Sequence, residues 1–187
     1  MGYFGSRTPI EWRDEHRTPK YIFAYADRRW GPIKVDLAAS SENPLCRYWI
    51  TKDQDSHTAC WHKIDQAGPA MKDAPIESGW CNPPYSQITP WIQKAIDEAR
   101  SDFTTIMLLP TFNGERRDKL IIDHATDIVM IVGRIGFVRP DGEKNSSNTR
   151  GSMLVRFAPP PTLDRGRTFA RLGYVLRDDI KREGPKS

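Results

Sequence analysis

The chain has 187 residues, the length of one domain with its own core, and its sequence contains no apolar run near the roughly 20 residues that a membrane span needs. The N-terminus lacks the apolar core of a secretory signal, and three cysteines without paired spacing do not suggest a disulfide framework, so we expect a cytoplasmic protein that does not attach to membranes. The net charge of +4 permits a nucleic-acid partner without requiring one.

A polar arm precedes the first predicted helix. Residues 1–17 are rich in charged side chains without a hydrophobic period, so they predict no regular element. Thr18 and Pro19 match a helix start, with threonine as the N-cap and proline at the first helical position. Gly31 and Pro32 predict the end of that helix.

An acidic residue lies in the short apolar segment that predicts the first strand, residues 33–40. Asp36 is followed by the small residues Ala38, Ala39 and Ser40, which let a ligand approach the backbone closely. A carboxylate at this place can accept hydrogen bonds from hydroxyl or ammonium groups of a ligand. The alternative is that Asp36 or Ser40 caps a following helix, and the glycine-rich loop usual in nucleotide sites is absent from the sequence.

The next segments predict a second strand, residues 45–51, and a long polar connection, residues 52–78. Within that connection His57, Cys60 and His62 are close in sequence. A zinc site normally has four ligands in a recognisable pairing, and no second pair follows, so the sequence predicts no metal site.

A stiff turn follows a short apolar run, residues 79–81. Pro83 and Pro84 cannot continue a helix or donate to a sheet, so they fix an extended backbone at the end of a predicted strand. Asn82 offers a donor pair and an acceptor before the prolines, and Tyr85 offers a stacking face after them. This arrangement suits the methylation of an amino group on a nucleobase, and its alternative is a proline-rich turn that only caps a strand.

The segment after this turn predicts the strongest helix of the chain, residues 88–100. Thr89 is the expected N-cap and Pro90 the first helical residue. The apolar run 103–110 predicts a buried parallel strand. Strand, turn, helix and strand together form one βαβ unit with the turn at its crossover.

The remaining residues predict alternating elements and a charged tail. We expect a loop and helix over 111–127, strands over 128–132 and 152–157, and a polar hairpin loop over 141–150. The sequence thus divides into an N-terminal arm (1–17), a compact domain (18–161) and a basic, charged C-terminal extension (162–187) that is weakly ordered or forms a short helix.

In their order and spacing these segments resemble the phage-type DNA adenine methyltransferase family, from about Thr18 to Pro160. The segments that carry the resemblance are Arg17-Thr18-Pro19, Val35-Asp36-Leu37-Ala38-Ala39-Ser40, Tyr48-Trp49-Ile50-Thr51, Trp80-Cys81-Asn82-Pro83-Pro84-Tyr85-Ser86, Leu108-Leu109-Pro110, Gly133-Arg134-Ile135-Gly136-Phe137 and Gly151-Ser152-Met153-Leu154-Val155-Arg156-Phe157.

The resemblance implies an α/β, Rossmann-like, S-adenosylmethionine-dependent methyltransferase, with a mostly parallel central sheet and a β-hairpin at its C-terminal edge. It implies methyl transfer to the N6 amine of adenine in double-stranded DNA, with GATC as a candidate recognition sequence. The target base would be flipped out of the duplex. A phage-encoded enzyme of this kind would act in the cytoplasm of its bacterial host.

The resemblance also assigns roles to residues. The catalytic residues would be Asn82, Pro83, Pro84 and Tyr85, with Asn82 and the Pro83 carbonyl accepting from the amine and Tyr85 stacking on the base. The residues beside S-adenosylmethionine would be Thr18, Pro19, Asp36, Ala38, Ala39, Ser40 and Asn82. The residues expected to contact DNA are Ser86, Arg116, Arg117, Lys119, Lys144 and Arg150.

The sequence departs from the family pattern at one position, and its central motif also occurs in enzymes with three other activities. His16 stands where the family often has tryptophan. A turn of the Asn-Pro-Pro-Tyr type also serves the methylation of cytosine N4, RNA adenine or protein glutamine. The non-enzymatic alternative is a DNA-binding relative that has lost catalysis.

Overall fold

The computed structural model describes residues 17–62, 76–138, 144–145, 151–159 and 170–183. Its main strands are β1 (Val35–Ala39), β2 (Tyr48–Thr51), β3 (Ser78–Cys81), β4 (Thr104–Pro110), β5 (Asp127–Val132), β8 (Ser152–Phe157) and β9 (Arg171–Leu176). Its helices are α1 (Lys20–Trp30), α2 (Ile88–Ala99), α3 (Arg116–His124) and α4 (Arg177–Glu183), and short 3-10 turns are η2 (Lys52–Gln54) and η3 (Tyr85–Gln87).

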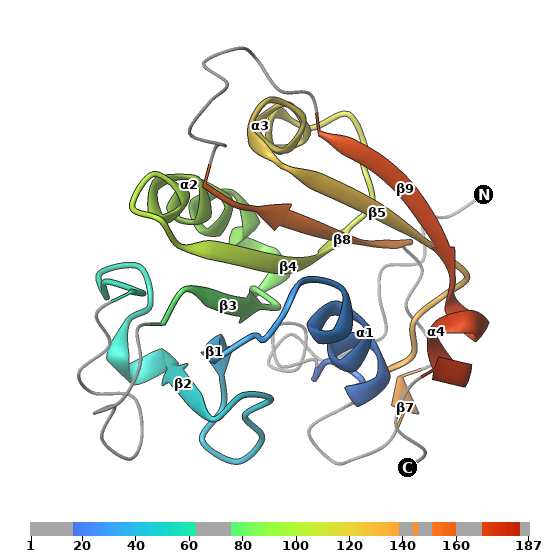
Figure 1. Cartoon of the computed structure of the whole chain (residues 1–187), viewed down its shortest axis with the longest axis horizontal. Helices are drawn as coiled ribbons and strands as arrows, with labels where there is room; N and C mark the ends of the chain where they lie inside the picture. The colour runs from blue at the N-terminus through green and yellow to red at the C-terminus, as the bar shows by residue number, and fades with distance from the viewer. Residues whose placement is uncertain (1–16, 63–75, 139–143, 146–150, 160–169, 184–187) are drawn as a thin grey trace, which may run out of the picture.

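The strands form one seven-stranded sheet in the order β2-β1-β3-β4-β8-β5-β9 (Figure 1). Within this sheet β8 is antiparallel to both of its neighbours, and the other neighbouring strands pair in parallel. The predicted mixed α/β fold with a mostly parallel central sheet is therefore confirmed.

The predicted hairpin at the C-terminal edge of this sheet is wrong. Strand β8 is buried on both faces and lies inside the sheet, between β4 and β5, while β9 forms the edge. A hairpin does exist, but β6 (Phe137–Val138) and β7 (Lys144–Asn145) form a separate two-stranded sheet.

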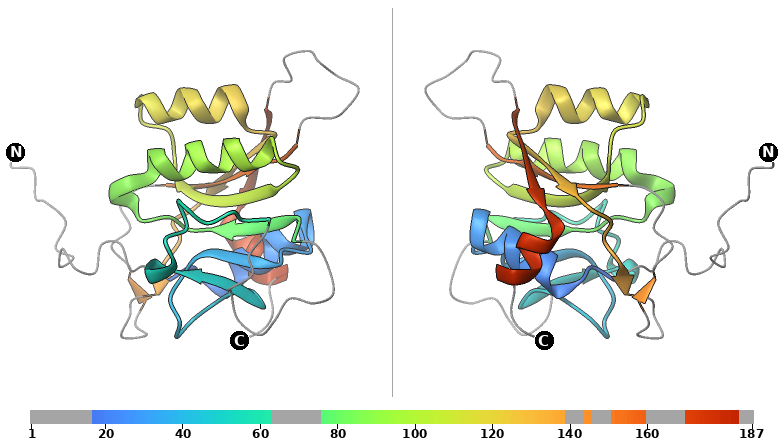
Figure 2. Two further views of the ribbon diagram at one scale, coloured as in Figure 1. Left: turned by 90° about the vertical axis from the view of Figure 1, so that its left-hand side faces the viewer. Right: turned by 90° about the vertical axis from the view of Figure 1, so that its right-hand side faces the viewer.

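Helices cover both faces of the sheet. Figures 1 and 2 show α2 and α3 on one face and α1 and α4 on the other. The alternation of side chains along β4 supplies both layers, because Met107 and Leu109 pack with the α2 side and Ile106 and Leu108 with the α1 side. A strand buried on both faces explains why its sequence is almost continuously apolar.

The two predicted helix starts differ from the structure. Helix α1 begins at Lys20, because Pro19 has an extended backbone with φ −60° and ψ 133°, and no side chain caps the helix. Helix α2 begins at Ile88 and lacks the predicted threonine cap, since the 3-10 turn η3 already directs the chain into the helix. The predicted apolar stripe of α2 is buried as expected.

The described C-terminal residues, 170–183, contain a short helix, which was one of the two forms predicted for the C-terminal extension, and a strand that was not predicted. Strand β9 pairs in parallel with β5, and Ile180 of α4 is fully buried against the α1 layer. The buried carboxylate of Asp127 binds Arg156 at 2.6 Å and Arg171 at 2.8 Å, and so joins strands β5, β8 and β9. This pairing was hidden because most side chains of β9 are exposed and the apolar pattern is weak.

None of the helices in the described part of the chain has the length and apolar character needed to cross a membrane.

A glycine in β3 sets how closely the first layers pack. A Cβ atom added to Gly79 would lie 2.8 Å from Leu37 Cδ1 and 3.0 Å from the Phe103 ring. We therefore expect Gly79→Ala to lower the free energy of unfolding by about 1–3 kcal/mol, measured by urea denaturation. The matched control is Gly173→Ala on β9, where an added Cβ meets no atom within 4 Å, and an equal loss in both variants would contradict the packing argument.

Candidate active site at the carboxyl edge of β1 and β3

The chain reverses its direction of travel across the sheet at β1. Strand β2 pairs on one side of β1, and β3 then pairs on the other side, in parallel and with Asp36 opposite Trp80. At such a switch point the connections leave the two strands in opposite directions and open a crevice at their carboxyl ends. The Asp36 segment and the Asn-Pro-Pro-Tyr turn, 82–85, therefore meet at one edge of the sheet.

A pocket of about 830 Å³ lies at this edge, within the size range of small-molecule sites. Predicted site residues in its lining are Thr18, Asp36, Ala38, Ala39, Ser40, Asn82, Pro84 and Ser86. Pro19, Pro83 and Tyr85 are not part of this lining, and Pro19 and Pro83 are buried. The structure thus brings all of the predicted cofactor residues except Pro19, together with Pro84 of the Pro-Pro turn, to one cavity.

The carboxylate of Asp36 is buried and holds the loop that follows β1. Its Oδ1 accepts a hydrogen bond from the N–H of Ala38 at 3.3 Å, and its Oδ2 accepts one from the N–H of Leu45 at 3.1 Å. No helix follows β1, so the capping alternative is wrong, and the oxygens close a loop that leads to β2.

Burial also changes the acidity of this group. Desolvation raises the pKa of Asp36 to about 6, and the two backbone hydrogen bonds oppose that rise. The carboxylate is therefore ionised at neutral pH. It is placed to attract a cationic group or to accept from hydroxyls in the pocket.

The Pro-Pro turn carries the two side chains that were predicted to act on the target base, Asn82 and Tyr85, and both are half-buried. Asn82 is half-buried and lines the pocket beside Pro84, whose backbone is extended with φ −53° and ψ 125°. The ring of Tyr85 is also half-buried and meets Phe137 edge to face, with ring centroids 6.2 Å apart. The buried hydroxyl of Tyr85 has no hydrogen-bond partner among the described residues, and burial raises the pKa of that hydroxyl.

The residues predicted to contact DNA differ in exposure, and one of them lies outside the described part of the chain. Ser86 is exposed at the rim of the pocket, and Arg116 and Lys119 are exposed on α3. Lys144 belongs to β7, and Arg150 lies outside the described residues.

Arg117 does not fit the role of an outer phosphate ligand. Its side chain is 3% exposed, its Nε lies 3.1 Å from a Glu115 carboxylate oxygen, and Nη2 donates to the Thr111 carbonyl at 3.4 Å. Glu115 and Asp118 form a capping box at the start of α3, which folds the Arg117 side chain inward. The predicted DNA contact of this residue is therefore corrected to a buried, ion-paired position.

Comparison with known proteins identifies the family. The family described as DNA N-6-adenine-methyltransferase (Dam) matches residues 5–187. The chain belongs to the Dam family. The resemblance inferred from the sequence is thereby confirmed.

Two Dam relatives come from phages. A DNA N-6-adenine-methyltransferase of Haemophilus phage HP1 (strain HP1c1) is 30% identical over 184 residues, which make up 96% of each chain. A protein of the same name from Escherichia phage T1 is 27% identical over 168 residues, or 81% of this chain and 66% of the T1 protein. The chain thus spans slightly less than two thirds of the T1 relative.

Sequence reasoning missed one wall of the pocket in this Dam-family chain. Asp53, Asp55, Ser56 and His57 line it from the connection after β2, and Trp91 lines it from α2. The connection was interpreted as a polar loop, and no residue pattern in it indicated which side chains face the pocket. Trp61, a large aromatic residue that is 0% exposed, anchors this connection to the core.

The buried hydroxyl of Tyr85, which has no hydrogen-bond partner among the described residues, leads to a prediction about stability. A buried hydroxyl without a hydrogen bond is destabilising, so Tyr85→Phe should raise the free energy of unfolding by about 1 kcal/mol in urea denaturation. Tyr174→Phe is the control, because Tyr174 is 77% exposed and its hydroxyl can be solvated. A loss of stability in Tyr85→Phe would show that the hydroxyl is paired after all.

Proposed function

We propose that this protein is a DNA adenine methyltransferase that transfers a methyl group from S-adenosylmethionine to the N6 amine of adenine in double-stranded DNA. The observation that carries the proposal is the shared pocket of Asp36 and Asn82 at the switch point of the sheet. Membership of the Dam family and the names of the two phage relatives support the same activity.

The pocket fits the proposed cofactor in chemistry. S-adenosylmethionine carries hydroxyl, ammonium and sulfonium groups, and the ionised Asp36 suits the positive or hydrogen-bond-donating ones. Ala38 and Ala39 keep the adjacent backbone accessible to a ligand. A Rossmann-like assignment is supported by the parallel strands and by the site beyond their carboxyl ends.

The Pro-Pro turn can activate the target amine without a strong base. The Asn82 side-chain oxygen and the Pro83 carbonyl accept the two N–H bonds of the amine, so its lone pair stays directed at the methyl group. Pro84 keeps this backbone extended, and Tyr85 stacks on the base. The bound cofactor supplies an electrophilic methyl group. The amine becomes cationic on transfer and afterwards loses a proton to solvent.

DNA reaches the pocket by its exposed rim. We assign phosphate or groove contacts to Ser86, Arg116 and Lys119, and extend the assignment to Lys144 and Arg150 of the hairpin region. Arg117 is left out because it is buried. The amine of a base that is stacked inside a duplex cannot reach the Asn82 turn, so the adenine is flipped out of the helix. The substrate of a phage-encoded enzyme would be DNA in the cytoplasm of the bacterial host.

The proposed mechanism makes a prediction about Asn82. Asn82→Ala should lower the rate of methyl transfer at saturating cofactor by roughly 100- to 1,000-fold, because one of the groups that orient the amine is lost. The measurement is incorporation of labelled methyl groups into duplexes with and without GATC, followed by nucleoside mass spectrometry. Gln93→Ala, an exposed amide on α2 outside the pocket lining, is the control.

Three results of that assay contradict the proposal. Full activity of Asn82→Ala would contradict the proposed role of Asn82. Label in cytosine, or only in RNA, would show that the substrate is not adenine in DNA. No label with any nucleic acid would favour the inactive DNA-binding alternative.

The proposed role of Asp36 makes the affinity for the cofactor depend on pH. Because the pKa of Asp36 is about 6, the carboxylate that faces the cofactor gains a proton as pH falls through that value. Calorimetric affinity for S-adenosylmethionine should fall by up to about tenfold per pH unit below it. Asp36→Asn should bind more weakly at neutral pH and show little further change on acidification. A wild-type affinity that is constant from about pH 7.5 to 5 would exclude the Asp36 assignment.

A further inference from the structure

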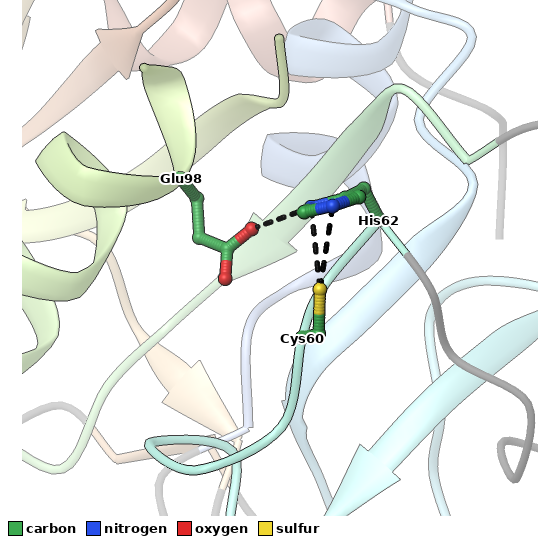
Figure 3. Close-up of side chains that lie close together, drawn as sticks. All are labelled: Cys60, His62 and Glu98. Carbon is green, nitrogen blue, oxygen red and sulfur yellow. Dashed lines mark hydrogen bonds and ion pairs between the residues drawn. The ribbon is translucent and has the colours of Figure 1, made fainter. Parts of the chain in front are cut away.

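A second cluster of chemically reactive side chains lies outside the methyltransferase pocket. Cys60 and His62 come from the connection after η2, and Glu98 comes from the C-terminal part of α2. Figure 3 shows the thiol, the imidazole and the carboxylate pointing toward one another. None of the three side chains is part of the pocket lining at the carboxyl edge.

The distances match the edges of a metal-coordination polyhedron. Cys60 Sγ is 3.4 Å from His62 Nδ1, and that nitrogen is 3.1 Å from Glu98 Oε2. Zinc bonds of about 2.3 Å to sulfur and about 2.0 Å to nitrogen or oxygen give tetrahedral edges of about 3.5 Å and 3.3 Å. The donor atoms all lie within 4.8 Å of one another, so one ion can bind all three once the His62 ring turns one nitrogen toward it.

The backbone between the two loop ligands is held rigidly. The indole of Trp61 is fully buried, and its Nε1 donates to the Ser56 carbonyl at 2.8 Å and to the Ser56 hydroxyl at 3.0 Å. The ring also stacks on Trp91 with centroids 6.4 Å apart. With Trp61 fixed in the core, the residues on either side of it are presented together.

The third ligand is also oriented in advance. The side chain of Glu98 is 6% exposed, and its Oε1 accepts from Lys94 Nζ at 2.7 Å and from the Trp61 N–H at 3.4 Å. Its other oxygen, Oε2, faces His62. A carboxylate whose outer oxygen is hydrogen-bonded is the usual form of a well-positioned metal ligand.

The same residue types also form nucleophilic triads, but the geometry disfavours that role. In such a triad the thiol lies on the axis of the ring nitrogen opposite the carboxylate. Here Cys60 Sγ is 3.4 Å from both His62 nitrogens, and so lies over the face of the ring and off the axis of either nitrogen (Figure 3). The sulfur is therefore not aligned for proton transfer to Nε2.

We propose that Cys60, His62 and Glu98 form a binding site for a zinc-like divalent cation, with water in the fourth position. Thiolate and imidazole are ligands that select such borderline-soft ions, and binding releases the thiol proton to solvent. The ion would link the connection after β2 to helix α2. The same connection carries His57, which lines the pocket at the carboxyl edge. The sequence predicts no metal here because Glu98 lies 36 residues after His62 and no local spacing reveals it.

Cobalt titration of the full, chelator-treated chain tests the site directly. We expect one Co²⁺ per chain, a near-ultraviolet thiolate-to-cobalt charge-transfer band, and visible absorption of the intensity typical of four-coordinate cobalt. Zn²⁺ should displace the cobalt and raise the melting temperature. This test is independent of the proposed methyltransferase activity because it needs neither cofactor nor DNA.

Variants separate this site from the other cysteines. Cys60→Ser changes an exposed residue and should abolish the charge-transfer band while the protein stays folded by circular dichroism. Glu98→Gln should weaken Co²⁺ affinity by at least about tenfold. Cys46→Ser is the matched control and should leave the band unchanged. Absence of the band in the wild type, or its persistence in Cys60→Ser, would overturn the proposal.

Discussion

The close parallel pairing of β1 with β3 is the constraint on which the functional edge depends. Gly79 has no side chain, which leaves room for Leu37 and Phe103 to pack directly over this pairing. The pairing fixes Asp36 opposite Trp80, so the turn that begins at Asn82 lies two residues beyond the level of Asp36. A shift of two residues in this register would separate the Asp36 carboxylate from the Asn82 amide by one strand repeat, about 7 Å. The pocket is therefore a consequence of sheet register as much as of its lining residues.

Local patterns in the sequence were sufficient for the elements that have strong signals. The continuous apolar run of β4 and the amphipathic stripe of α2 predicted a buried strand and its covering helix, and the Pro-Pro turn was correctly expected at the end of a strand. The predicted N-cap at Thr89 is wrong because a preceding 3-10 turn can start a helix without a side-chain cap. No residue pattern in this segment distinguishes a helix that starts after a 3-10 turn from one that starts at a capping side chain.

The remaining differences concern contacts between distant parts of the chain. Arg117 resembles a solvated basic residue in the sequence, but the capping box of α3 and the carboxylate of Glu115 make its burial acceptable. Strand β9 carries a weak apolar pattern and is held by the ion pairs of Asp127, which draw on two arginines from other strands. Glu98 and His62 are also far apart in the sequence and form a contact in the fold. Such pairings depend on topology, and hydrophobic period and residue spacing do not encode them.

The contact between α1 and α4 has a consequence for biosynthesis. Ile22 and Ile180 are buried in one cluster, Lys181 lies 5.7 Å from the centre of the Tyr21 ring, and Arg28 pairs with Glu183. Strands β3 and β4 can cover much of the apolar face of α1 early, because Trp80, Ile106 and Leu108 belong to the same cluster. The part of α1 that contacts α4 gains its cover only after α4 has been translated, so this layer of the fold is completed late in synthesis.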